Sequence, residues 1–131
     1  MVVYVHQPMN GEPMKKLITL TVLASAALPT FAADTFKEPL ERLGPKQQEF
    51  RNQATAGDYQ GMRNLAFSYA EPFKGEAGSK IGACAWYLLI PAVHKQKFDN
   101  GDTGNISVYC GKLSPTELNT AYTYAFRVLA K

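Results

Sequence analysis

Gly57-Asp-Tyr-Gln-Gly-Met-Arg-Asn-Leu-Ala-Phe-Ser-Tyr-Ala70 is the stretch of sequence that decides the fold. Its small and apolar residues recur at helical spacing and form one stripe, made of Gly61, Met62, Leu65, Ala66 and Tyr69. The carboxylate of Asp58 can accept hydrogen bonds from the free N–H groups of a first helical turn. The stretch therefore predicts a helix with one buried face that begins near Asp58.

A second predicted helix runs from about Ser79 and is apolar on nearly every side, through Ile81, Ala83, Cys84, Ala85, Trp86, Leu88 and Leu89. A helix without a polar face needs neighbours on more than one side. Residues 71–79 contain Pro72, Gly75 and Gly78, which is typical of a turn. The two helices are therefore expected to fold back on each other as an antiparallel hairpin.

Ten positions of this hairpin follow one repeat pattern: Gly57, Asp58, Gly61, Asn64, Leu65, Ala66, Tyr69, Ala83, Trp86 and Tyr87. In them the chain resembles the Sel-one-like repeat, a relative of the tetratricopeptide helix pair. Gly61 replaces the usual Ala, the 71–78 turn replaces a Gly-rich one, and Pro91 stands where small helical residues are usual. The resemblance implies an all-α fold, a short right-handed superhelix of antiparallel helix pairs with four to five helices.

The flanking sequence supplies further expected helices over 46–56, Ile106–Lys112 and 115–130. One complete repeat cannot bury its own apolar faces, so these helices must serve as half-repeats. Ser114-Pro115-Thr116-Glu117 is a capping signal for the last helix, which resembles the terminal helix of Sel-one-like proteins. That helix is expected to cap the stack and to bury one stripe, made of Leu118, Ala121, Tyr122, Ala125 and Leu129.

The connecting segments are expected to be irregular. A loose lead-in with a short turn of helix is predicted over 34–43, and a turn over 99–105. Pro91 lacks an N–H and clashes with the carbonyl of Tyr87, so the second helix is expected to kink or stop there. Residues 92–98 are read as a bent extension of that helix.

The N-terminal part of the chain is typical of an export signal. Met14-Lys15-Lys16 precedes an uncharged apolar stretch that ends in small residues, with cleavage predicted after Ala32. Residues 1–13 are then an extension produced by an early start codon, 14–32 the signal peptide and 33–131 a single helical domain in the periplasm or outside the cell. A stable membrane span after cleavage is not expected.

Composition gives little support to catalysis or to nucleic-acid binding. The net charge of +3 is mild, the basic residues are scattered, and no Gly-rich phosphate loop is present, so neither nucleic acid nor nucleotide is expected. No cofactor or metal is expected, since His94 reads as a solvated residue and 99–105 lacks the oxygen spacing of a calcium loop. Glu71 and Glu76 lie in a turn with no apolar pocket in evidence.

Tyr59, Arg63 and Phe67 are the candidate partner-binding residues, because they lie four residues apart on a face of the first helix that avoids the buried stripe. Exposure is expected for Tyr59 and Arg63. For Phe67, exposure and packing against helix 46–56 are both open.

The sequence favours an exported helical-repeat protein that binds a protein or peptide and is not an enzyme. A special case is an inhibitor or immunity-type protein that masks a toxin or an envelope enzyme. A small cell-wall hydrolase with unrecognised catalytic carboxylates and a purely structural envelope protein are the alternatives from other classes.

Cys84 and Cys110 are the two cysteines of the chain, and an oxidising compartment favours one disulfide between them. Two free buried thiols are the alternative, and a redox role is disfavoured because the pair is not a Cys-x-x-Cys motif. In the chain-entropy picture this link stabilises the fold by about 3.5 kcal/mol.

The exported form, denatured without reductant, is expected to show no cysteine that reacts with an alkylating reagent. Mass spectrometry of the intact chain measures the number of labels. Two labelled cysteines would contradict the disulfide.

Overall fold

The structure, a computed structural model, describes residues 36–131. The predicted extension over 1–13 and the predicted signal peptide over 14–32, with its cleavage point after Ala32, lie outside the described residues. Residues 36–131 belong to one compact unit.

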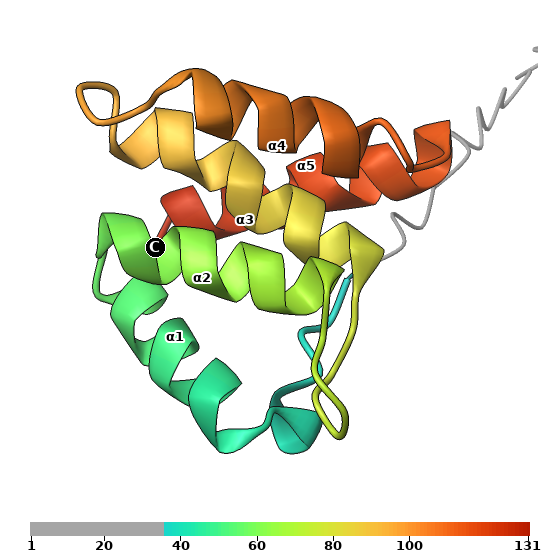
Figure 1. Ribbon diagram of the computed structural model, residues 1–131. Helices are drawn as coiled ribbons and strands as arrows, with labels where there is room; N and C mark the ends of the chain where they lie inside the picture. The colour runs from blue at the N-terminus through green and yellow to red at the C-terminus, as the bar shows by residue number, and fades with distance from the viewer. Residues whose placement is uncertain (1–35) are drawn as a thin grey trace, which may run out of the picture. The chain divides into compact units, whose positions relative to one another are not determined.

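The described part of the chain is entirely helical, with no strand, which confirms the predicted all-α class (Figure 1). Within residues 36–131, no helix has both the length and the apolar character needed to cross a bilayer. The elements are a short 3-10 turn, η1 (Leu40–Arg42), and five helices: α1 (Pro45–Thr55), α2 (Tyr59–Ala70), α3 (Lys80–Val93), α4 (Asn100–Cys110) and α5 (Pro115–Leu129).

Two glycines set the junction between α1 and α2. Gly57 has a φ of 85°, in the left-handed region that glycine enters at little cost. The Gly57 N–H donates to the Ala54 carbonyl and the Asp58 N–H to the Gln53 carbonyl, each at 3.0 Å, so α1 ends in a Schellman motif. Gly61 allows α2 to approach α1 closely, because a Cβ at that position would lie 2.5 Å from the Cβ of Gln53.

The α2–α3 hairpin forms as predicted, and side chains cap the start of each helix. Asp58 Oδ1 accepts the Gly61 N–H at 2.6 Å, and Ser79 Oγ accepts the Gly82 N–H at 2.9 Å. The predicted stripe of α2 is fully buried, which confirms the expectation for its members Gly61, Met62, Leu65, Ala66 and Tyr69.

A buried glutamine holds the long turn between α2 and α3. Gln47 of α1 is 0% exposed, and its Oε1 accepts the Ala77 N–H at 2.9 Å. Its Nε2 donates to the carbonyls of Ala77 at 2.8 Å and Ser68 at 3.3 Å. One side chain thus joins α1, α2 and the 71–79 turn.

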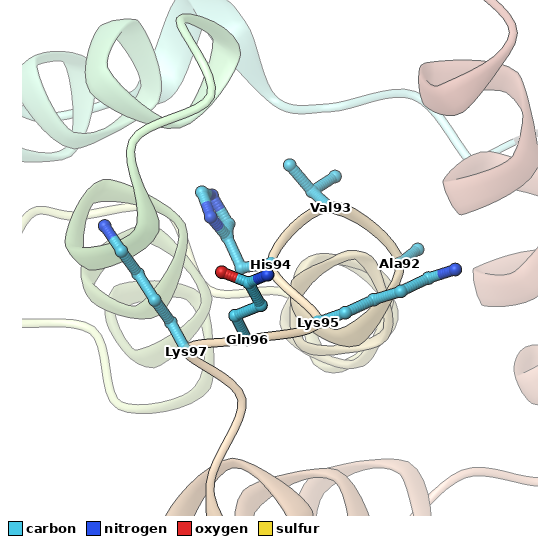
Figure 2. A pocket seen from close by; sticks show the side chains of 6 residues that line it. All are labelled: Ala92, Val93, His94, Lys95, Gln96 and Lys97. Atoms are coloured by element: carbon cyan, nitrogen blue, oxygen red, sulfur yellow. The ribbon is translucent and has the colours of Figure 1, made fainter.

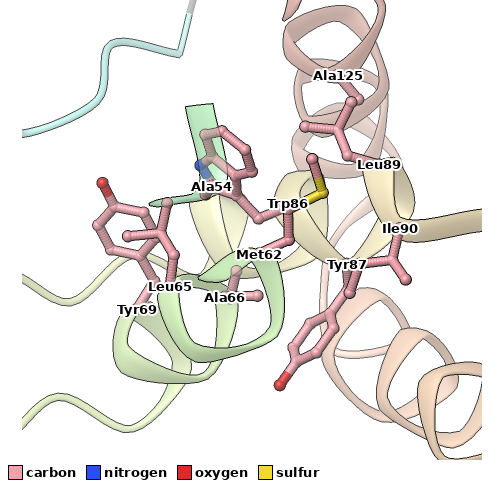
Figure 3. Close-up of a cluster of buried hydrophobic side chains, with 11 residues drawn as sticks. Ala54, Met62, Leu65, Ala66, Tyr69, Trp86, Tyr87, Leu89, Ile90 and Ala125 are labelled. Carbon is pink, nitrogen blue, oxygen red and sulfur yellow. The ribbon is translucent and has the colours of Figure 1, made fainter. Parts of the chain in front are cut away.

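The main core lies between α2 and α3 and reaches α5 through Ala125, as Figure 3 shows. Six of its side chains are the largest apolar ones with less than 2% exposure: Trp86, Tyr69, Tyr87, Leu65, Leu89 and Ile90. Helix α3 packs against α2, α4 and α5, as expected for a helix that is apolar nearly all round.

Pro91 does not stop α3, which continues to Val93. Of the two predicted outcomes at Pro91, a stop is therefore wrong, and a kink stays a prediction. The predicted extension over 92–98 is wrong beyond Val93. Proline removes one backbone donor and disturbs the preceding turn, but α3 ends two residues later and few further bonds depend on that turn. The His94 N–H closes the helix on the Ile90 carbonyl at 2.8 Å.

The predicted turn over 99–105 is wrong, because α4 begins at Asn100. A capping box starts the helix: Asp99 Oδ1 accepts the Asp102 N–H at 3.0 Å, and Asp102 Oδ2 accepts the Asp99 N–H at 3.2 Å. The glycines inside α4, Gly101 and Gly104, disfavour helix by about 1 kcal/mol each. The side chain of Asp102 is buried. Its contacts with α2 favour the helix that the propensities of Gly101 and Gly104 disfavour.

Helix α5 begins with the predicted capping box, in which the Ser114 N–H donates to Glu117 Oε2 at 2.8 Å. Hydrogen bonds from Ser114 to the carboxylate lower the pKa of Glu117. The predicted buried stripe is only partly correct, because Tyr122 is 44% and Leu129 46% exposed. Phe126, at 67%, is more exposed still.

The predicted disulfide is confirmed: the Sγ atoms of Cys84 and Cys110 are bonded at 2.08 Å. The bond joins the middle of α3 to the last residue of α4. It lies in a second apolar cluster, whose other buried members are Ala85 and Ala121. The crosslink therefore ties the α2–α3 hairpin to the C-terminal helices.

Gly61→Ala is expected to lower the free energy of unfolding by about 1–3 kcal/mol, since the added methyl group would overlap α1. Gly104→Ala is the matched control in α4, because a Cβ there meets no atom within 4 Å. That variant should gain about 0.5–1 kcal/mol from helix propensity. Urea unfolding measures both variants, and equal stabilisation by the two would contradict the close approach at Gly61.

Candidate functional site

Helix α2 presents Tyr59, Arg63 and Phe67 along one side, and the structure places them in different environments. Phe67 is 49% exposed. Tyr59 is half-buried, and the Arg63 side chain is 29% exposed. The expected exposure of Tyr59 and Arg63 is therefore only partial, whereas the ring of Phe67 faces solvent.

A buried carboxylate of α4 explains why Tyr59 and Arg63 are partly covered. Asp102 is 0% exposed, and its Oδ2 accepts the Tyr59 hydroxyl at 2.6 Å. Arg63 Nε lies 3.2 Å from Asp102 Oδ1, and Arg63 Nη1 donates to Tyr59 Oη at 3.3 Å. This triad fixes both α2 side chains against α4.

The ring of Tyr59 also contacts the segment that follows α3. The Tyr59 and His94 rings pack edge-to-face, with 5.4 Å between their centroids. Lys97 Nζ lies 5.9 Å from the centroid of the Tyr59 ring. Partial burial raises the pKa of Tyr59, and the hydrogen bond to Asp102 raises it further. Tyr59 is thus held as a neutral phenol that donates to a carboxylate.

His94 is not the solvated residue that the sequence suggested. Its Nε2 lies 2.7 Å from the Gly57 carbonyl, and because a carbonyl only accepts, Nε2 carries the hydrogen. Figure 2 shows His94 and Lys97 pointing to the same side of the turn and Lys95 to the other. A surface hollow of about 300 Å³ lies in this turn, lined by residues 92–97.

A second polar cluster surrounds Glu38, which the sequence did not single out. Its carboxylate receives hydrogen bonds from Trp86 and Tyr69 and pairs with Arg51. Burial raises the pKa values of Tyr69 and Tyr124 above the usual range, and the nearby Glu38 carboxylate adds to both shifts. No local signal marks Glu38, because its partners lie 13 to 48 residues away in the chain.

The carboxylates named for a hydrolase lie apart from these clusters. Glu71 is exposed at the end of α2, and Glu76 Oε2 accepts the Phe73 N–H at 3.1 Å. Among residues 36–131, no group of three or more His, Cys, Asp or Glu side chains is placed to hold a metal ion.

The chain matches no protein-family model, and comparisons with curated proteins and with solved structures give no match. The resemblance to the Sel-one-like repeat therefore stays a prediction made from the sequence.

Asp102→Asn is expected to lower the free energy of unfolding by about 2 kcal/mol, because it leaves Arg63 beside a neutral amide in a site that excludes water. Asp99→Asn is the control, since Asn caps a helix as well as Asp does and this residue stays exposed. Urea unfolding of both variants measures the difference. Equal losses would show that the charge of Asp102 has no special role.

Proposed function

We propose that the chain is an exported helical-repeat protein of the Sel-one-like type that binds a protein or peptide partner and catalyses no reaction. The α2–α3 hairpin would be its one complete repeat, with α1 before it and α4 and α5 after it as half-repeats of a short right-handed superhelix. The disulfide fits an oxidising compartment such as the periplasm, in which such a crosslink persists.

The exposed ring of Phe67, beside two side chains that the fold holds in place, is the observation on which this proposal rests. Phe67 is 49% exposed, although α2 is otherwise a core helix with six buried residues. Tyr59 and Arg63 are fixed by Asp102, so they would lose little conformational entropy on binding. Aromatic residues and arginine with fixed geometry are common anchors of protein interfaces.

The environments of the named carboxylates favour binding over the hydrolase alternative. A general acid at neutral pH requires a carboxyl group in an apolar or like-charged pocket. Glu71 is exposed, and the buried carboxylate Glu38 is neutralised by Arg51, with 2.9 Å between Arg51 Nε and Glu38 Oε2. We name the side of α2 that carries Tyr59, Arg63 and Phe67 the α2 face. An inhibitor or immunity-type protein would use this same face and would differ only in its partner.

The oxidised, exported form of the chain serves as bait in an envelope extract of the source organism. Phe67→Ala in this bait should abolish the capture of a partner. With the partner purified, its dissociation constant should rise at least tenfold for this variant, as measured by calorimetry. Phe67 is a better position to substitute than Tyr59 or Arg63, because its ring is exposed and makes no part of the Asp102 triad.

Phe126→Ala is the matched control, because it removes an exposed ring from α5 rather than α2. The proposal that the α2 face binds the partner would be overturned by either of two results. One is partner binding that Phe67→Ala leaves unchanged, and the other is an equal loss of binding with Phe126→Ala. Absence of any partner, with self-association at micromolar concentration, would favour a structural protein.

A further inference from the structure

A cleft of about 340 Å³ lies beside Trp86, between α1 and α5. Its lining is largely apolar and comes from α2, α3 and α5, through Met62, Trp86, Leu89, Val93, Tyr124 and Val128. Lys131 adds positive charge to its lining, which also includes Arg51, the ion-pair partner of Glu38. None of Tyr59, Arg63 and Phe67 lines this cleft, so it is separate from the α2 face.

The N-terminal end of the described chain packs beside this cleft. We name residues 36–43 the strap. Figure 1 shows it running from beside the start of α3 to η1 and α1. Phe36 packs edge-to-face on Tyr124, with 5.1 Å between the ring centroids and 82° between the planes. Its ring also approaches Gly82, where a Cβ would lie 3.0 Å from Phe36 Cζ.

Glu38 is the second anchor of the strap, and three helices supply its partners. Its Oε1 accepts the Trp86 indole N–H at 2.7 Å and the Tyr69 hydroxyl at 3.3 Å. Its Oε2 accepts from Arg51 Nε at 2.9 Å. The Glu38 side chain is only 5% exposed, so this is a built carboxylate site in the wall of the helical core.

The groups that hold Glu38 belong to α1, α2 and α3 and would remain if the strap left. The Trp86 N–H and the Tyr69 hydroxyl would then lose their carboxylate acceptor. The arginine would lose its counter-charge as well. A carboxylate from another chain would suit the same groups, since it accepts from the two neutral donors and pairs with the arginine.

Four of the six other side chains of the strap are exposed. Lys37, Glu41 and Arg42 are exposed, and Leu40 is 48% exposed. Phe36 and Glu38 thus provide the main contacts of its first part, and Leu43, its last residue, packs against the main core. Arg51, Trp86 and Tyr124 border both the strap and the cleft, so a segment bound in place of the strap would adjoin the cleft.

We propose that this region is a peptide-binding site for an extended segment of a partner protein that carries an aromatic side chain two residues before a carboxylate. The strap occupies the site in the free protein. A tethered segment has an effective concentration of about millimolar, so a partner must gain contacts that the strap lacks. Apolar side chains of the same segment, placed in the cleft that the strap does not line, supply that gain.

Fluorescence of Trp86, the single tryptophan of the chain, reports on this site directly. The full chain with Phe36→Ala and Glu38→Gln releases the strap while keeping a neutral acceptor at position 38. A synthetic peptide with the sequence of residues 36–43 should then change the Trp86 emission in a saturable way. The same peptide with Glu38→Gln should bind at least tenfold more weakly.

Panning random octapeptides on this double variant, with elution by the strap peptide, tests the proposed ligand. Enrichment of an aromatic residue two positions before Asp or Glu is expected. Enriched peptides without an acidic residue would overturn the proposal, as would a strap peptide that fails to bind a double variant with helical circular dichroism. Phe36→Ala alone replaces the double variant if the latter does not fold.

Strap exchange between two copies of the chain is the competing occupant. A dimer of the unmodified chain in light scattering that dissociates in the double variant would assign the site to a second copy and overturn the partner segment. The Phe67→Ala variant should leave all these measurements unchanged. Failure of the proposed peptide site can therefore be distinguished from failure of the proposed partner binding by the α2 face.

Discussion

Enclosure of α3 is the constraint on which the rest of the structure depends. This helix has eight buried residues in fourteen and no polar face, so water must be excluded from almost its whole circumference. Helices α2, α4 and α5 each cover one side, and the strap lies against its first half. A short chain must use most of its helices for this cover.

Buried polar side chains determine how the covering elements are positioned. Gln47, Glu38 and Asp102 each join segments that are distant in the sequence, and a hydrogen bond in a dry interior is strong and costly to lose. Asp102 is the least well satisfied of the three. Its Oδ1 lies 3.2 Å from Arg63 Nε but has no aligned hydrogen bond, so attraction between charges holds that contact.

Two surfaces can therefore be considered for binding, and they differ in character. On α2, the exposed ring of Phe67 lies on the same helix as Tyr59 and Arg63, which are already held by α4. Beside the cleft between α1 and α5, the Glu38 carboxylate of the strap is held by groups from three helices. On the first surface the Phe67 ring is exposed, whereas on the second the strap covers the carboxylate site and leaves the adjoining cleft free.

The sequence by itself determined the helical class, the buried stripe of α2, the caps of α2 and α5, and the Cys84–Cys110 bond. These features follow from periodicity and from contacts within a few residues, or from the absence of any other cysteine. Tertiary structure alone decided the helix that begins at Asn100, the exposure of Tyr122 and Leu129, and the partners of Glu38 and His94. The helix at Asn100 has a local capping box, but two glycines oppose it and the contact of Asp102 with α2 favours it. The other features depend on groups far away in the chain, whose approach no local pattern records.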